Sequence, residues 1–139
     1  MEIRTSYYAN LKSIDKTKYY PIAISRYLPK NINLTQILEL APPSWLIKEK
    51  NQGKFIEEFQ KRLECLDSME VYELLKSISK EKVPVLLCYE KPGEFCHRHI
   101  IAEWFEKAGI RVKELGYEDY ERVNYRIIEN KIQTLWDNQ

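Results

Sequence analysis

The chain has 139 residues and a formal net charge of +1, with 22 lysines and arginines against 21 aspartates and glutamates. This length suits a single domain with its own core over residues 1–139. The balanced charge argues against a protein whose main task is to coat nucleic acid or an anionic membrane, although it leaves room for a local nucleic-acid groove. The sequence has no run of about 18 apolar residues and no signal-peptide pattern, so we expect no membrane partner.

The chain contains three cysteines. An odd number does not suit a disulfide framework, so we expect a cytoplasmic protein in a reducing compartment. The sequence does not indicate the oligomeric state.

Two strands are predicted near the N-terminus. Apolar and polar side chains alternate in residues 2–8, which is typical of a strand, and Tyr7 lies near its carboxyl end. Residues 20–25 contain a short apolar run, which favours a strand covered on both faces. Arg26 follows directly at the carboxyl end of that strand, and Thr35 is expected to cap a short helix.

Two amphipathic helices come next, followed by a strand, a polar loop and another helix. Apolar residues recur at helical spacing in residues 54–66, and Asp67 with Ser68 offers an N-cap for the second helix. The apolar run at residues 83–88 predicts a buried strand. Helical spacing resumes in residues 97–108.

The end of the chain completes the predicted architecture. Gly109 suits the end of a helix, residues 110–115 read as a fourth strand, and residues 117–137 have apolar side chains at mostly helical spacing. The alternation of strands and helices predicts an α/β fold, a small three-layer domain with a mainly parallel sheet of about four strands and helices on both faces.

The polar segment between the strand at residues 83–88 and the next helix is the strongest candidate site. Ligands of open α/β sheets bind at such turns, and Tyr7 and Arg26 should meet it because they also end strands. Its polar and reactive side chains are Cys88, Glu90, Glu94, Cys96, His97, Arg98 and His99.

The helix after this turn opens with three basic side chains at residues 97–99. A helix N-terminus carries partial positive charge and unpaired N–H groups, so cations there need compensation. One interpretation is a bound anion held by the backbone N–H groups and Arg98. The other is compensation by nearby carboxylates, and both stay open. The candidate carboxylates are those of Glu90, Glu94 and Glu103.

A cysteine nucleophile is one chemistry that the segment suggests. A helix N-terminus with Arg98 and His97 nearby lowers a thiol pKa and so raises the thiolate population. Cys96 lies at the helix start and is the better candidate, whereas Cys88 ends an apolar strand, so an inert buried thiol is a stronger alternative for Cys88 than for Cys96. Cys65 is expected to be a packing residue.

A metal site is a second hypothesis, because Cys88, Glu90, Cys96, His97 and His99 include ligand types that zinc prefers. The two cysteines are eight residues apart and lack the short spacing of compact structural sites, so only a loop that folds back could close the site. We therefore predict no metal and no cofactor.

An acid–base site is the third hypothesis. Glu90 lies two residues after Cys88 and so points to the same side of an extended strand end. Burial would raise its pKa, whereas Arg26 or Arg98 would lower it. A carboxylate beside an arginine suits a phosphorylated or glycosidic substrate. The alternative is a structural glutamate–arginine pair that ties the loop to the sheet.

Several motifs resemble those of a known family. Leu86-Leu87-Cys88-Tyr89-Glu90 followed by Cys96-His97-Arg98 resembles the signature of the uncharacterised "domain of unknown function 488" family. Ser25-Arg26 followed by Pro29 is similar to the family's second-strand motif, although Ile24 stands where that motif usually has an aspartate. The resemblance covers residues 5 to about 115, and it implies a small α/β domain with its site at these motifs.

We therefore predict an enzyme that acts on an anionic, nucleotide-like small molecule. One alternative is a non-catalytic module that binds nucleotides or nucleic acid, and another is a zinc-stabilised interaction domain. The expected site residues are Glu90, Cys96 and His97 as catalytic groups, Arg26, Arg98 and Tyr7 as anion-binding groups, and Cys88 and His99 as further contributors.

Overall fold

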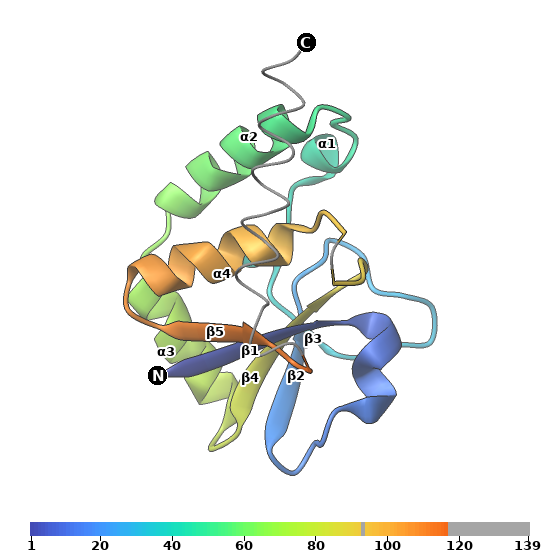
Figure 1. The fold of residues 1–139 in the computed structure, drawn as a ribbon, viewed down its shortest axis with the longest axis vertical. Helices are drawn as coiled ribbons and strands as arrows, with labels where there is room; N and C mark the ends of the chain where they lie inside the picture. The colour runs from blue at the N-terminus through green and yellow to red at the C-terminus, as the bar shows by residue number, and fades with distance from the viewer. Residues whose placement is uncertain (93, 117–139) are drawn as a thin grey trace.

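The computed structural model describes residues 1–92 and 94–116. Within them, five strands form one sheet in the order β3-β2-β4-β1-β5, and each neighbouring pair is parallel (Figure 1). The predicted α/β class with its parallel sheet is confirmed. The strands are β1 (Glu2–Tyr7), β2 (Tyr19–Ala23), β3 (Thr35–Gln36), β4 (Val83–Cys88) and β5 (Arg111–Glu114).

The strand that the sequence did not predict is β3. Thr35 was expected to cap a helix, but Thr35 and Gln36 instead pair with Ile22 and Ala23 of β2. A two-residue strand of this kind is held by its neighbour in the sheet, so local propensity carries little information about it.

Four α-helices and two short 3₁₀ helices complete the described residues. Asp67 caps α3 as predicted, because its carboxylate accepts hydrogen bonds from two backbone N–H groups of the first turn. None of the described helices is long and apolar enough to cross a membrane. The predicted helix at residues 117–137 lies outside the described residues. The helices are η1 (Tyr8–Ser13), η2 (Leu38–Leu40), α1 (Ser44–Ile47), α2 (Gln52–Glu64), α3 (Ser68–Ser79) and α4 (His97–Lys107).

The three long helices pack on one face of the sheet, where Figure 1 shows α2 and α4 lying side by side. Phe59 of α2, Leu75 of α3 and Phe105 of α4 are fully buried in the same core cluster as Ile22 and Leu86 of the sheet. Each such side chain contributes about 1.5–3 kcal/mol on burial. On the other face, Tyr8 of η1 packs with sheet residues that include Ala23, Val85 and Leu87.

Strand β4 positions the candidate site. It lies between β1 and β2 and is covered on both faces, so Val85, Leu86 and Leu87 are all buried. Its last residue, Cys88, therefore reaches the carboxyl edge of the sheet beside the end of β2. At the far end of α4, Gly109 has a positive φ of 86°, which suits the predicted helix end.

Candidate functional site

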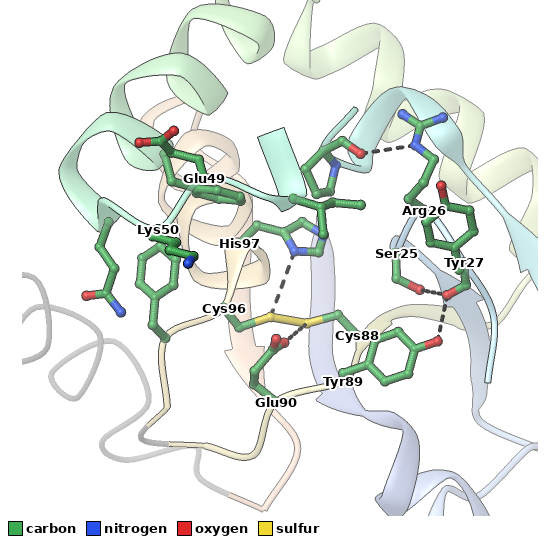
Figure 2. Close-up of a pocket in the computed structure, with 15 residues that line it drawn as sticks. Ser25, Arg26, Tyr27, Glu49, Lys50, Cys88, Tyr89, Glu90, Cys96 and His97 are labelled. Atoms are coloured by element: carbon green, nitrogen blue, oxygen red, sulfur yellow. Dashed lines mark hydrogen bonds between the residues drawn. A yellow bond between two sulfur atoms is a disulfide. The ribbon is translucent and has the colours of Figure 1, made fainter. Parts of the chain in front are cut away.

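A cavity of about 440 Å³ lies at the carboxyl ends of β2 and β4 (Figure 2). We call it the site cavity. Its lining includes residues 25–27, 88–90 and 95–97 together with Lys50 and Phe55. Because β2 and β4 are neighbours, the residues that follow them meet at one edge. The predicted residues Arg26, Glu90, Cys96 and His97 are among those that line it.

A disulfide between Cys88 and Cys96 forms part of the cavity wall. The expectation that three cysteines would form no disulfide was therefore wrong, because the loop after β4 folds back and brings two of them together. Cys96 is only 3% exposed, whereas the free Cys65 is exposed and is not the packing residue that helical spacing suggested. In this oxidised form neither Cys88 nor Cys96 is a thiolate.

Glu90 sits beside this disulfide. Its carboxylate oxygen Oε2 lies 3.7 Å from Cys88 Sγ, in agreement with the prediction that the two side chains share one side of the strand end. The backbone carbonyl of Glu90 accepts a 2.7 Å hydrogen bond from Nη1 of Arg98. The loop is thus tied to the helix through its backbone, and the Glu90 carboxylate faces the cavity (Figure 2).

Arg98 does not line the site cavity. It is fully buried and forms two hydrogen bonds with the Glu114 carboxylate, Nε to Oε1 at 2.9 Å and Nη2 to Oε2 at 2.7 Å. Thr5 donates a further 2.7 Å hydrogen bond to Glu114. Burial raises the pKa of the Glu114 carboxyl, but the bonds from Arg98 and Thr5 outweigh it and hold that pKa below its usual range.

Glu114 provides the carboxylate that balances the charge of Arg98, and the sequence analysis did not identify it. That analysis had instead named Glu90, Glu94 and Glu103. The available signal was the spacing within β5, because Glu114 lies two residues after the buried Val112 and so shares its face. A carboxylate on an inward-facing position needs a cationic partner. Arg98 is that partner, and so the geometry does not give Arg98 the predicted anion-binding role.

The two histidines are neutral rather than cationic at neutral pH. Burial, with a smaller contribution from the neighbouring Arg98 cation, lowers the pKa of His97 and of His99 to about 4. His97 Nε2 lies 2.7 Å from the carbonyl oxygen of Ile24, so the neutral ring donates its proton there. Its Nδ1 then carries the lone pair and lies 4.0 Å from Cys96 Sγ.

The remaining predicted residues lie in different surroundings. Arg26 donates hydrogen bonds to the carbonyls of Pro42 and Ala41, and Figure 2 shows its guanidinium pointing away from the disulfide. Tyr7 and His99 do not line the site cavity. The neighbouring Tyr8 contacts two residues that do line it, because its hydroxyl is hydrogen-bonded to Ser25 at 2.5 Å and its ring packs edge-on against Tyr89.

Comparison with known proteins places the chain in a family. No curated protein and no solved structure matches it significantly. A family model described as "Active DUF488-N3 subclade" matches residues 6–109, which include Arg26, both disulfide cysteines and α4. The match spans most of the chain and contains the motifs that carried the resemblance. The chain therefore belongs to the DUF488 family.

Proposed function

We propose that the chain is an enzyme that acts on an anionic, nucleotide-like small molecule in the site cavity. The observation that carries the proposal is the presence of cationic, aromatic and carboxylate side chains around a single cavity of about 440 Å³. Cavities of roughly 300–1,000 Å³ are typical of small-molecule sites. Such a mixture suits a ligand with one charged end and one flat, apolar end.

Arg26 and Lys50 are the cationic side chains that would bind the anionic end. Glu49 and Glu90 also line the cavity, so the negative charge of the ligand would lie against Arg26 or Lys50 rather than against these carboxylates. Since Arg26 points away from the disulfide, a phosphate held by it would lie far from the sulfurs. The opposite end of the ligand would then reach Glu90.

Aromatic rings supply the surface for the flat end of the ligand. Phe55 and Phe95 pack edge to face with ring centroids 5.5 Å apart, and both line the cavity. Tyr27 and Tyr89 line it as well. A base that stacks on one such ring gains about 1–3 kcal/mol.

Glu90 is the group that would transfer a proton, because its carboxylate faces the cavity beside the sulfurs. Cys96 and His97 would form or order the reactive group next to it. We place this activity in the cytosol, where glutathione and thioredoxin keep most thiols reduced. There both Cys88 and Cys96 would be thiols.

Ligand-dependent melting tests the binding half of the proposal. At a nucleotide concentration about a hundred times Kd, binding adds about 2.7 kcal/mol to the free energy of unfolding, which raises Tm by several degrees. Arg26→Ala should remove most of this shift, and Lys61→Ala, an exposed lysine of α2 outside the cavity, should retain it. Chloride at matched ionic strength separates generic salt effects. No shift with phosphate or any common nucleotide would refute the anion site.

Turnover tests the enzymatic half. In a screen of nucleotides and nucleosides followed by chromatography, Glu90→Gln should lower kcat by about 100-fold or more while the melting shift persists. Unchanged turnover in this variant would remove Glu90 from the chemistry.

A non-catalytic module for nucleotides or nucleic acid is the second candidate. It is favoured by the exposure of Tyr27 and Tyr89, which are 62% and 49% exposed and could stack bases of a single strand. A melting shift without turnover would support this candidate. Comparison of a mononucleotide with a short single-stranded oligonucleotide then identifies the ligand, because only the oligonucleotide gains from stacking on additional rings.

A further inference from the structure

Two sulfurs and one imidazole nitrogen come together in the wall of the site cavity. Cys88, Cys96 and His97 each offer a ligand atom, and these atoms lie within 4.8 Å of one another. All three residues are buried, yet all three line the cavity. We propose that, in the reduced chain, Cys88 Sγ, Cys96 Sγ and His97 Nδ1 bind one zinc ion whose fourth coordination position opens to the cavity.

The spacing of these atoms suits zinc. Zinc bonds of about 2.3 Å to sulfur and 2.0–2.1 Å to nitrogen place tetrahedral ligand atoms about 3.6–3.8 Å apart. Cys96 Sγ and His97 Nδ1 are 4.0 Å apart, so this pair needs little movement. The α-carbons of Cys88 and Cys96 are 7.5 Å apart, wider than the roughly 4.4–6.8 Å usual for disulfides. The backbone therefore leaves room for an ion between the sulfurs.

The orientation of His97 is already that of a ligand. Zinc-binding histidines usually donate the second ring N–H to a carbonyl or carboxylate, which fixes the tautomer. Here Nε2 lies 2.7 Å from the Ile24 carbonyl, and the ring packs edge-on against the buried Phe59 with centroids 5.4 Å apart. The lone pair of Nδ1 is thus directed toward Cys96 Sγ.

Cys88 has a hydrogen-bond donor that would stabilise its thiolate. Arg98 Nη1 lies 3.3 Å from Cys88 Sγ, and a charged donor at this distance favours the ionised sulfur. Glu114 neutralises the guanidinium through two hydrogen bonds, so the cation adds little net repulsion toward a metal ion. The Arg98–Glu114 pair would therefore orient one zinc ligand from outside the coordination sphere.

Three protein ligands and one open position are the arrangement of catalytic zinc, whereas structural zinc has four protein ligands. Glu90 stands next to the open position, with Oε2 at 3.7 Å from Cys88 Sγ. A water or a substrate oxygen at that position would lie between the metal and this carboxylate. A zinc ion with an open position differs from the purely structural zinc of the interaction domain that the sequence suggested. The proposed zinc site does not depend on the nature of the substrate.

Metal binding and the disulfide exclude each other. A dithiol reductant gives two electrons and two protons to the Cys88–Cys96 bond, which breaks to two thiols while the reductant becomes a disulfide. Zinc then displaces one proton from each thiol on binding. The eight-residue separation that argued against zinc in the sequence carries no weight, because the loop folds back and closes the site.

The test is a metal titration of the full-length chain. The protein is reduced with a phosphine, desalted under nitrogen, and titrated with zinc against a chromogenic chelator and separately with cobalt(II). We expect one zinc per chain, and a cobalt complex with sulfur-to-metal charge transfer and the strong visible absorption of four-coordinate cobalt. The oxidised chain should bind neither ion.

Matched cysteine variants identify the ligands. Cys65→Ser removes the exposed cysteine and should leave the affinity unchanged, whereas Cys96→Ser should weaken it about 100-fold or more. If Cys96→Ser fails to fold by circular dichroism, X-ray absorption of the zinc-loaded Cys65→Ser chain decides, and two sulfur neighbours are expected. Zinc coordinated only by oxygen and nitrogen, or equal loss in both variants, overturns the proposal. Because no nucleotide is used, this result is independent of the proposed enzymatic function.

Discussion

At the scale of single residues, the buried pair of Arg98 and Glu114 connects α4 to the edge strand β5. Both side chains are fully buried. Arg98 also donates to the backbone of Glu90 and contacts Cys88, so one guanidinium holds the strand end, the loop and β5 together. The role that this geometry gives Arg98 is to position the site residues, whereas Arg26 and Lys50 line the cavity.

Glu114→Ala should lower the free energy of unfolding by about 3–5 kcal/mol, because it leaves a buried guanidinium without its counter-charge. The control is Glu57→Ala, which breaks an exposed ion pair with Lys61 on α2 and should cost less than about 1 kcal/mol. Urea unfolding of the two variants measures the difference. Equal losses would mean that water reaches Arg98 and that the pair contributes little.

At the scale of elements, the N-terminus of α4 concentrates basic residues where the helix dipole disfavours cations. The structure resolves this conflict with two neutral histidines and one paired arginine. Both histidines are therefore neutral in the folded chain at neutral pH, since burial lowers the pKa of each to about 4. The unfolded chain, with ordinary histidine pKa values near 6.5, binds more protons than the folded chain between about pH 6.5 and 4.

The oxidised chain should consequently lose stability as the pH falls through this window. Because the unfolded state binds the extra protons, the free energy of unfolding rises with pH, by up to about 1.4 kcal/mol per pH unit for each histidine. The chain has only these two histidines, so His99→Gln should roughly halve the slope. Urea midpoints at pH 7, 6 and 5 measure it. A midpoint that stays constant over this range would show that the histidines remain accessible to solvent.

The elements with strong local patterns were predictable, and the contacts between distant segments were not. The apolar run of β4 and the Asp67 cap of α3 are encoded over a few neighbouring residues. Strand β3 depends on pairing with β2, and the ion pair of Arg98 with Glu114 joins two elements. The sequence placed Arg26, Glu90, Cys96 and His97 together because parallel strands share one carboxyl edge.

At the scale of the whole molecule, the Cys88–Cys96 link joins the central strand of the sheet to the helix that packs on it. The link joins two cysteines that are eight positions apart in the sequence, and it lies where β4, α4 and the site cavity meet. We therefore expect reduction of this bond to affect both the stability of the fold and the site cavity.

Reduction of this disulfide should lower the free energy of unfolding by about 2–3 kcal/mol, because the open loop gains conformational entropy in the unfolded chain. The Cys65→Ser background excludes mispairing with the third cysteine. Zinc added to the reduced chain should restore stability by mass action on the folded state, with the gain growing as zinc exceeds its Kd. Thermal melts of the oxidised, reduced and zinc-loaded forms should therefore give the lowest Tm for the reduced, metal-free form. If the reduced form melts together with the oxidised form, the disulfide contributes nothing to the fold and serves only the chemistry of the cavity.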